Sequence, residues 1–379
     1  MRVALQGVER VESPQRLAMA TKLTQIAAAG FKSIASLSLE LRDLNVLIGA
    51  NGAGKSNFVG LFAMLSQLAD KRLQLFVATS GGPDALLTNG VKHTDTLSVA
   101  LRFDQQGYSF ELVPTADDKL VFASEACRWF GPNPAPYHLE LGAGHAEALL
   151  HKAHAPRPLA PLTLEAMKGW GVYHFHDTSR EAKVKQLGPV DDNATLRPDA
   201  ANLAAFLLLL EQKHPAQYRL VVETVRLAAP FFDDFRLRPS PANEEKIRLE
   251  WRAKHTDAYF NAHALSDGTL RFICLATLLL QPTLPSLLLI DEPELGLHPY
   301  AINLLAGLLK AAATCTQVVV STQSVTLVDQ FEPGDLVVVD RNGDGSAFRR
   351  LAPDELAGWL DDYSLGELWE KNVFGGRPR

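Results

Sequence analysis

The stretch Gly49-Ala50-Asn51-Gly52-Ala53-Gly54-Lys55-Ser56 has the form GxxxxGK(S/T) of a phosphate-binding loop. Its glycines let backbone N–H groups surround phosphate oxygens without a Cβ in the way. An apolar strand at 44–48 leads directly into the loop, and apolar residues recur at helical spacing after Lys55. This order is the context that such a loop requires, and it argues against a chance glycine-rich turn. The sequence therefore predicts a nucleotide site.

The chemistry of this loop indicates ATP and Mg²⁺ as the cofactors. Lys55 would supply a cation to the β- and γ-phosphates, and Ser56 would supply a hydroxyl ligand to Mg²⁺. The helix that starts there adds its N-terminal dipole. We expect seven residues of this region to bind the nucleotide: Gly49, Asn51, Gly52, Gly54, Lys55, Ser56 and Asn57.

A second segment, Leu287-Leu288-Leu289-Ile290-Asp291-Glu292, is a buried strand that ends in two carboxylates. The carboxyl ends of strands are where α/β sheets place ligand sites. We expect Asp291 to hold Mg²⁺ through water and Glu292 to polarise the attacking water. Adjacent acids often begin a solvated loop, but the matching phosphate loop and the following Pro293 favour the catalytic interpretation.

The distance between the two segments narrows the class of ATPase. Asp291 follows Ser56 by 235 positions (291 − 56), whereas compact ring-forming ATPases and small GTPases place their acidic strand much sooner. Just ahead of the acidic strand lies Leu265-Ser266-Asp267-Gly268-Thr269-Leu270-Arg271. Read alone, Ser-Asp-Gly is a turn and a helix cap. Its place between the two segments favours a functional role.

These features resemble ABC-type ATPases of the RecF, SMC and OLD kind over most of residues 21–379. Residues 265–271 resemble the LSxGxxR signature of that family, and Gly30-Phe31-Lys32-Ser33 resembles its NFKS segment. Residues 294–299 resemble the D-loop, and 318–324 resemble the strand that ends in Thr-His-Ser.

In that family the signature serine and glycine contact the γ-phosphate bound to the opposite subunit. The resemblance therefore implies that Ser266 and Gly268 bind nucleotide across an ATP-dependent homodimer. It implies an ATPase, with Lys55, Glu292 and Gln323 as catalytic residues and with Ser56 and Asp291 as the metal ligands.

The chain departs from the family pattern at two places. Gln323 stands where the family has a histidine, and glutamine donates a hydrogen bond but cannot carry a proton. We therefore expect slow turnover. No glutamine forms an obvious Q-loop, and by position residues 173–179 replace it. His174 and His176 would share one face of a strand there, and metal binding with Asp177 is the less favoured alternative because no third ligand is identifiable.

The expected fold class is α/β, a P-loop ABC-type ATPase with a mixed central sheet, an antiparallel β subdomain and an inserted helical layer. Residues 1–20 are expected to form a disordered extension. Residues 21–130 would form the first ATPase lobe, with the phosphate loop and antiparallel strands. Residues 131–230 would be an inserted loop and helical region, with loops and a short helix over 131–163. Residues 231–379 would form the second lobe, with the signature, the acidic strand and C-terminal helices.

The bulk composition excludes several classes of protein. No apolar stretch approaches the roughly 18 residues of a membrane span. We expect no secretion, because the first residues have no apolar core followed by a cleavage site. Three cysteines without CxxC spacing, Cys127, Cys274 and Cys315, fit a reducing cytoplasm rather than disulfides or zinc. The net charge of −6 means that nucleic acid could bind only at a local patch. We therefore expect a cytoplasmic protein without a membrane partner.

Two outputs remain open for such an ATPase. The resemblance implies DNA-linked work, namely repair or defence against phage, with DNA and a separate nuclease or toxin effector as partners. The alternative is a regulatory switch that holds or releases an effector protein without acting on DNA. Residues 236–254 carry six basic and three acidic side chains, which either track phosphates or form a solvated strand face, and sparse aromatic residues favour the latter.

Overall fold

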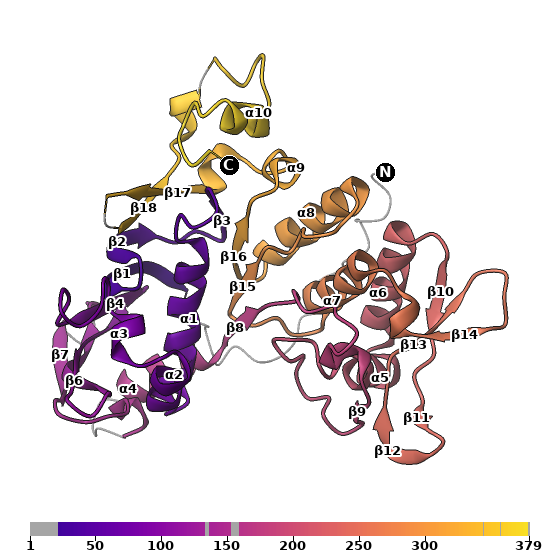
Figure 1. Ribbon diagram of the computed structural model, residues 1–379, viewed down its shortest axis with the longest axis horizontal. Coiled ribbons are helices and arrows are strands. Elements are labelled where there is room, and N and C mark those ends of the chain that lie inside the picture. The colour runs from indigo at the N-terminus through magenta and orange to yellow at the C-terminus, as the bar shows by residue number, and fades with distance from the viewer. Residues whose placement is uncertain (1–21, 133–135, 153–158, 344, 357, 378–379) are drawn as a thin grey trace.

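The computed structural model describes residues 22–377 apart from 133–135, 153–158, 344 and 357. The expected N-terminal extension over 1–20 lies outside the described residues. Two six-stranded sheets and a helical layer make up most of the described chain (Figure 1). The mixed sheet, the antiparallel sheet and the helical layer of the expected fold class are confirmed.

The central sheet has the strand order β18-β17-β3-β16-β15-β8. Five of its strands run parallel to one another, and the edge strand β18 pairs antiparallel with β17. The sheet is therefore mixed. Continuous apolar runs form its inner strands because both faces of the sheet are covered. Its strands are β3 (Leu44–Ile48), β8 (Trp170–Tyr173), β15 (Leu287–Asp291), β16 (Gln317–Thr322), β17 (Leu336–Asn342) and β18 (Gly345–Arg350).

The second sheet is antiparallel throughout, with the order β2-β1-β4-β5-β6-β7. Its first hairpin turns at residues 31–34, as the alternation of apolar and polar residues predicts. Strand β7 was missed, because 131–163 was expected to hold only loops and a short helix. The strands are β1 (Leu23–Phe31), β2 (Ile34–Glu40), β4 (Leu97–Phe103), β5 (Gln106–Pro114), β6 (Leu120–Trp129) and β7 (Tyr137–Gly142).

The alternation of side chains divides the two faces of the central sheet between two cores. Leu287 and Leu289 face the core shared with the antiparallel sheet, and Leu288 and Ile290 face the core of the helical layer. The first core includes α1 (Lys55–Ala69), α2 (Leu73–Thr79), α3 (Pro83–Leu86) and α4 (Leu159–Lys168).

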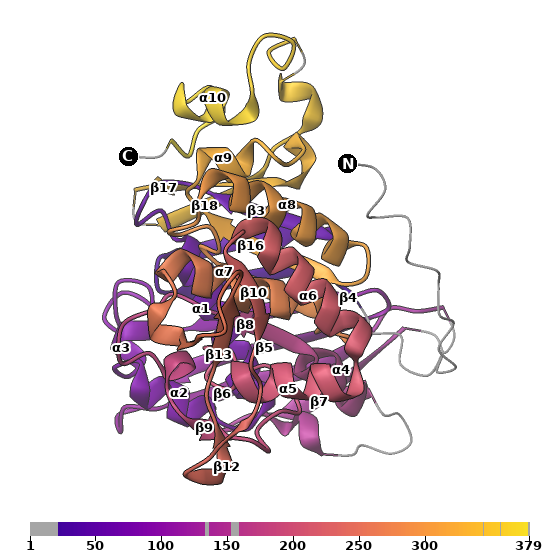
Figure 2. The ribbon, with the colours of Figure 1, turned by 90° about the vertical axis from the view of Figure 1, so that its right-hand side faces the viewer.

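The other core is built by six helices, of which Figure 2 shows α5, α6 and α7 in front of the sheet. They are α5 (Leu203–Lys213), α6 (Pro215–Ala228), α7 (Asp267–Leu280), α8 (Pro299–Ala313), α9 (Val325–Val328) and α10 (Leu365–Glu370). None of the helices in the described part of the chain has the length and apolar character needed to cross a bilayer.

Two small sheets flank the helical layer. Residues 232–240 and 243–253 each contribute one strand to either sheet, because the chain passes from one small sheet to the other. One sheet holds β10 (Phe232–Phe235), β13 (Glu250–Ala253) and β14 (Tyr259–Asn261), and the other holds β9 (Gly188–Pro189), β11 (Pro239–Ser240) and β12 (Asn243–Ile247). Short 3₁₀ turns cover Leu149–His151, Lys183–Lys185, Ala262–Ala264, Pro333–Asp335 and Pro353–Leu356.

The two six-stranded sheets are joined by the buried side chain of Gln317 in β16. Its Oε1 accepts from the Leu23 N–H (2.7 Å), and its Nε2 donates to the Leu23 carbonyl (2.9 Å). Gln317 is 2% exposed. A single amide therefore satisfies both backbone groups at the start of β1 and fixes the antiparallel sheet against the nucleotide-binding sheet.

Replacing Gln317 with alanine should lower the free energy of unfolding by about 2–4 kcal/mol, because two buried backbone groups lose their partners. Urea denaturation measures this change. Gln25→Ala is the control, since the Gln25 amide bonds to the exposed Ser38 hydroxyl, and it should change stability by less than about 0.5 kcal/mol. Equal effects of the two substitutions would contradict the joining role of Gln317.

Candidate nucleotide-binding site

The ends of three neighbouring strands define the site. β16 pairs in parallel with β3 on one side and β15 on the other, which places Ile48, Thr322 and Asp291 at one edge of the sheet. The phosphate-binding loop follows β3 and the two acids close β15. Segments separated by more than two hundred residues in the sequence thus meet at the carboxyl edge, where α/β sheets bind ligands.

The loop conformation depends on glycine. Gly54 has φ of +120°, and a Cβ at that position would clash with the Ser346 side chain in β18. The Asn57 amide donates to the Ser33 hydroxyl (2.6 Å), which also bonds to Ser346 (2.7 Å). Asn57 therefore ties α1 to the β1–β2 turn.

Lys55 lies inside the loop that it follows. Its Nζ donates to the carbonyls of Gly49 (2.6 Å) and Ala50 (3.1 Å), and the residue is 4% exposed. Burial lowers the pKa of the Lys55 ammonium, and the nearby charges of Glu292 and Asp291 oppose that shift. These carbonyl oxygens take the place of water around the Lys55 ammonium. A phosphate oxygen could replace them.

The residues expected to hold Mg²⁺ fit a hard cation. Asp291 is buried, and its Oδ1 has no hydrogen-bond partner. Its register neighbour on β16, Ser321, likewise has a buried hydroxyl without a partner. Ser56 is exposed at the start of α1. Such unpartnered buried oxygens are rare, and Mg²⁺ is commonly bound by one or two protein oxygens together with substrate phosphates and water.

Glu292 has a strained backbone and a defined partner. Its φ is +43°, a left-handed conformation that is costly for a side chain of this size. Its N–H donates to the Ser321 carbonyl (2.8 Å), and its Oε1 accepts from the Gln323 side-chain amide. Gln323 therefore contacts the carboxylate expected to act on water, and it does so without a titratable group.

Glu294 is a third carboxylate at this edge, where the sequence pattern indicates only a residue of the D-loop region. Its Oε1 accepts from the Thr322 hydroxyl (2.5 Å) and from the Gln323 N–H (3.2 Å), whereas its buried Oε2 has no partner. Burial raises its pKa above the ordinary value. Glu294 thus holds the turn that carries Gln323. Its position four residues after Ile290, the last apolar residue of the strand, is the available signal.

The signature segment begins α7. Ser266 is the N-cap, and its hydroxyl bonds to the N–H (3.2 Å) and hydroxyl (2.8 Å) of Thr269. A Cβ on Gly268 would clash with the Gly296 carbonyl in the D-loop region, so glycine permits close approach there. Ser266 is exposed, and its bonds are local. The turn and cap interpretation is therefore correct for its local structure, and the exposed face leaves the serine accessible.

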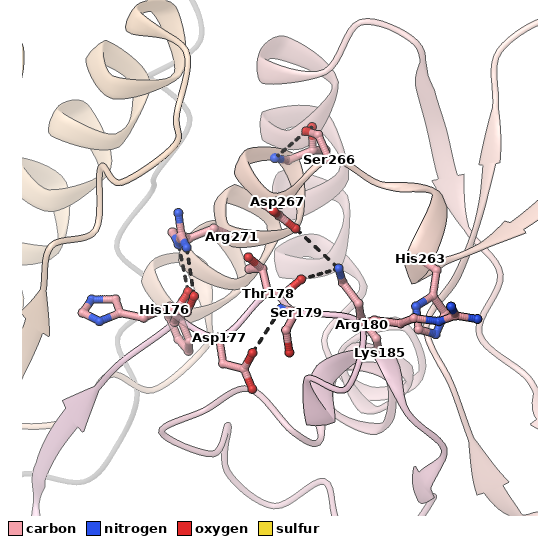
Figure 3. Close-up of polar contacts among 12 residues, drawn as sticks. His176, Asp177, Thr178, Ser179, Arg180, Lys185, His263, Ser266, Asp267 and Arg271 are labelled. Atoms are coloured by element: carbon pink, nitrogen blue, oxygen red, sulfur yellow. Dashed lines mark hydrogen bonds and ion pairs between the residues drawn. The ribbon is translucent and has the colours of Figure 1, made fainter.

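Figure 3 shows how the segment after β8 connects to the signature helix. The Arg271 guanidinium donates to the carbonyls of Phe175 (2.8 Å), His176 (3.1 Å) and Leu295. The buried Lys185 ammonium donates to the Thr178 carbonyl (2.5 Å) and lies 3.4 Å from Asp267. One network therefore links the segment expected to replace the Q-loop, the signature helix and the D-loop region.

The predicted strand through His174 and His176 is wrong, because β8 ends at Tyr173 and the His174 N–H donates to the Pro198 carbonyl (3.0 Å). Burial lowers the pKa of His174. His176 Nε2 bonds to the Asp291 carbonyl (2.9 Å), which places this segment beside the acidic strand. Across the described residues, no group of three or more His, Cys, Asp or Glu side chains could hold a metal ion by itself.

Three of the four arginines in 236–254 form ion pairs with carboxylates. Arg252 and Arg226 share Asp233, and Arg238 and Arg248 share Glu250. The guanidinium of Arg236 lies 3.6 Å from the ring centroid of Tyr259. These pairs fit the solvated strand face, which was the favoured interpretation of this segment.

The fold is that of Smc head domains, the ABC-type ATPase fold. One similar solved structure is an Smc head bound to the C-winged helix domain of ScpA, with 16% identity and a TM-score of 0.57. That alignment covers 88% of this chain and 99% of the other. Another is the Pyrococcus furiosus Smc head with an extended coiled coil bound to the C-terminal domain of ScpA, with 14% identity and a TM-score of 0.58. It covers 90% of this chain and 98% of the other.

Residues 44–329 match the family described as "AAA domain, putative AbiEii toxin, Type IV TA system", and the chain belongs to that family. The matched region begins at β3 and ends just after α9, so it contains the phosphate loop, the signature segment and the acidic strand. A comparison with curated protein sequences gave no match.

The raised pKa of Glu294 gives a pH-dependent prediction. The folded protein binds this proton more tightly than the unfolded chain, so the contribution is fully present below the ordinary pKa of 4.5 and is lost as pH rises through the folded pKa. Glu294→Gln is neutral at every pH. Its stability relative to the wild type should therefore increase as pH rises above about 4.5, measured by thermal unfolding across the pH range.

Glu355→Gln provides a control of opposite sign. The Ala352 N–H lowers the pKa of exposed Glu355, so this carboxylate stabilises the fold above its ordinary pKa and the substitution loses stability as pH rises. A stability difference for Glu294→Gln that stays constant with pH would contradict the proposed burial of a titrating carboxyl group.

Proposed function

We propose that this protein is a slow ATPase whose two nucleotide sites are completed by dimerisation. The observation that carries the proposal is the meeting of the phosphate loop, Asp291 and Gln323 at one sheet edge, while Ser266 lies exposed at the start of α7. The loop and the acids of one subunit lie together, whereas its signature serine lies on an exposed surface. This arrangement fits a dimer in which each subunit supplies its serine to the site of the other.

ATP and Mg²⁺ would be held by residues with distinct tasks. Lys55, the loop N–H groups and the start of α1 would bind phosphate oxygens, and Ser56 and Asp291 would hold the metal ion. When bound, Mg²⁺ neutralises charge on the phosphates. Glu292 would orient and polarise water, and its carboxylate is already held by the Gln323 amide. Ser266 and Gly268 of the other subunit would complete the site.

The bond between Gln323 and Glu292 supports slow turnover. The Gln323 side-chain amide donates to Glu292 Oε1, so one oxygen of the carboxylate expected to polarise water is already engaged in a hydrogen bond. Gln323 also cannot accept or release a proton during the reaction. The ATP-bound dimer would therefore persist, and ATP would act as a ligand that shifts a population between open and closed forms.

Glu292→Gln should bind ATP with Mg²⁺ and accumulate as a dimer, because nucleotide closes the dimer and the water-polarising carboxylate is missing. Light scattering coupled to size exclusion measures the mass with and without ATP. Lys55→Ala is the matched control and should stay monomeric and lose nucleotide binding, since the phosphate cation is removed. A Glu292→Gln protein that binds ATP and remains monomeric would contradict the composite site.

For the output, we infer that control of an effector protein is better supported than direct work on DNA. Arg238, Arg248 and Arg252 pair with carboxylates, and the chain carries a net charge of −6. The Smc head structures contain a bound protein domain, so this fold can carry a protein partner. DNA repair or phage defence remains the process that the resemblance to RecF-like proteins implies, with the effector as the acting component.

Turnover of ATP should therefore not respond to DNA. Phosphate release by the wild-type protein should change by less than about twofold when single- or double-stranded DNA is added at low salt, where phosphate contacts are strongest. Arg236→Glu serves as a charge control and should leave turnover in the presence of DNA unchanged. Stimulation of turnover by DNA that Arg236→Glu removes would instead establish a DNA-linked ATPase.

A further inference from the structure

A groove of about 790 Å³ lies between the two halves of the molecule, away from the phosphate loop. Its floor is β8, which Figure 1 shows between α1 and the helical layer. One wall is formed by small and polar residues of α1, and the opposite wall by apolar residues of α5. The wall residues are Ala63, Ser66 and Gln67 on α1, and Phe206, Leu209 and Leu210 on α5.

The floor of this groove is an open sheet edge. β8 is the last strand of the central sheet and pairs only with β15 among the described strands. The Gly169 carbonyl accepts from the Ser286 N–H (2.8 Å) on the β15 side. The His174 N–H lies on the opposite side and donates to the Pro198 carbonyl (3.0 Å), which occupies the edge just after β8. Because backbone groups alternate sides along a parallel strand, those of Trp170 and Val172 point into the groove. A strand edge of this kind is a template for another chain.

The walls match the two faces that an added strand would have. The side chains of Trp170 and Val172 lie in the core shared with α1, and Tyr173 lies in the core of the helical layer. A strand beside β8 continues the sheet, so its alternate side chains would face α1 and α5 in turn. The α5 wall suits apolar side chains, and the α1 wall suits polar ones.

The charge of the groove selects among such segments. No Asp or Glu is among the residues that line it, whereas Lys168 lies at its rim, in a protein with a net charge of −6. A carboxylate on the incoming segment would therefore meet a cation and no like charge.

We propose that this groove binds an extended segment of a partner protein, which pairs with the free edge of β8 and alternates apolar residues with acidic ones. Backbone hydrogen bonds to Trp170 and Val172 would hold the segment, apolar side chains would pack against α5, and a carboxylate would reach Lys168. This site lies beyond the ATPase reaction and does not depend on hydrolysis.

The segment that follows β8 connects the groove to the nucleotide site. His174 lines it, and two residues later His176 bonds to the Asp291 carbonyl. Arg271 fixes the carbonyls between these positions to the signature helix. A bound segment would thus lie on the strand that leads directly to the acidic edge and the signature.

The test uses the full-length protein without nucleotide and a short fluorescein-labelled peptide of alternating valine and glutamate as the probe. Fluorescence anisotropy gives its affinity, and hydrogen exchange locates it. The peptide should bind and protect the amides of Trp170 and Val172. The same peptide with N-methylated backbone amides should bind about tenfold more weakly or worse, because it cannot donate to the strand edge.

Two substitutions of Val172 in β8 distinguish loss of the free strand edge from loss of folding. Val172→Pro removes the outward N–H and leaves the ladder to β15, and the preceding Gly171 tolerates a following proline. It should abolish peptide binding, while Val172→Thr keeps the N–H and retains it. Thermal unfolding of both proteins shows that each is folded. Lys168→Glu should weaken binding of the valine–glutamate peptide and favour a valine–lysine peptide.

Equal binding of the N-methylated peptide, or undiminished binding to folded Val172→Pro, would overturn the added strand. Protection of the groove by a second copy of the chain, seen as a nucleotide-independent dimer that competes with the peptide, would overturn the partner segment as its occupant. Absence of any peptide binding to the wild type would overturn the proposal as a whole. None of these results depends on whether ATP is hydrolysed.

Discussion

The parallel pairing of β16 between β3 and β15 is the constraint on which the rest of the site depends. It brings the ends of three strands to one edge, although the chain leaves the phosphate loop and returns only after the antiparallel sheet and the helical layer. The register places Asp291 beside Ser321 and the loop beside Thr322. A shift of one residue in this register would turn Leu288 and Ile290 toward the wrong core, so the same burial that stabilises the sheet also fixes the catalytic geometry.

The sheet edge beside the phosphate loop carries an excess of negative charge. Three carboxylates, Asp291, Glu292 and Glu294, surround one buried ammonium, Lys55, and each is held differently. Asp291 has an oxygen without a partner, Glu292 is bonded to Gln323, and Glu294 is bonded to the turn that carries Gln323. Asp291 is therefore available to a cation, Glu292 is available to water, and Glu294 is available to neither. Glutamine at 323 connects the last two without adding a titrating group.

Sequence patterns predicted those parts of the fold that have a strong local signal. The phosphate loop, the buried strand ending at Asp291, the hairpin near Gly30 and the helix after Ser266 follow from apolar periodicity, glycine and capping residues. The histidine segment was misjudged because β8 ends after four residues, where Pro198 takes the next N–H. Contacts such as Gln317 with Leu23, or Glu294 with Thr322, join distant segments and leave no periodic signal. The open edge of β8 is likewise a property of sheet order, which only the folded chain reveals.

The central claim is that each nucleotide site contains residues of two subunits, and complementation between two inactive variants tests it most directly. Lys55→Ala removes the phosphate cation, and Ser266→Arg blocks the signature surface, so each protein alone should lack ATPase activity. A mixture forms dimers in which one site combines an intact loop with an intact signature segment. Phosphate release from the mixture, where neither variant shows any, is the predicted result. A mixture as inactive as its components, although mixed dimers form, would contradict the account.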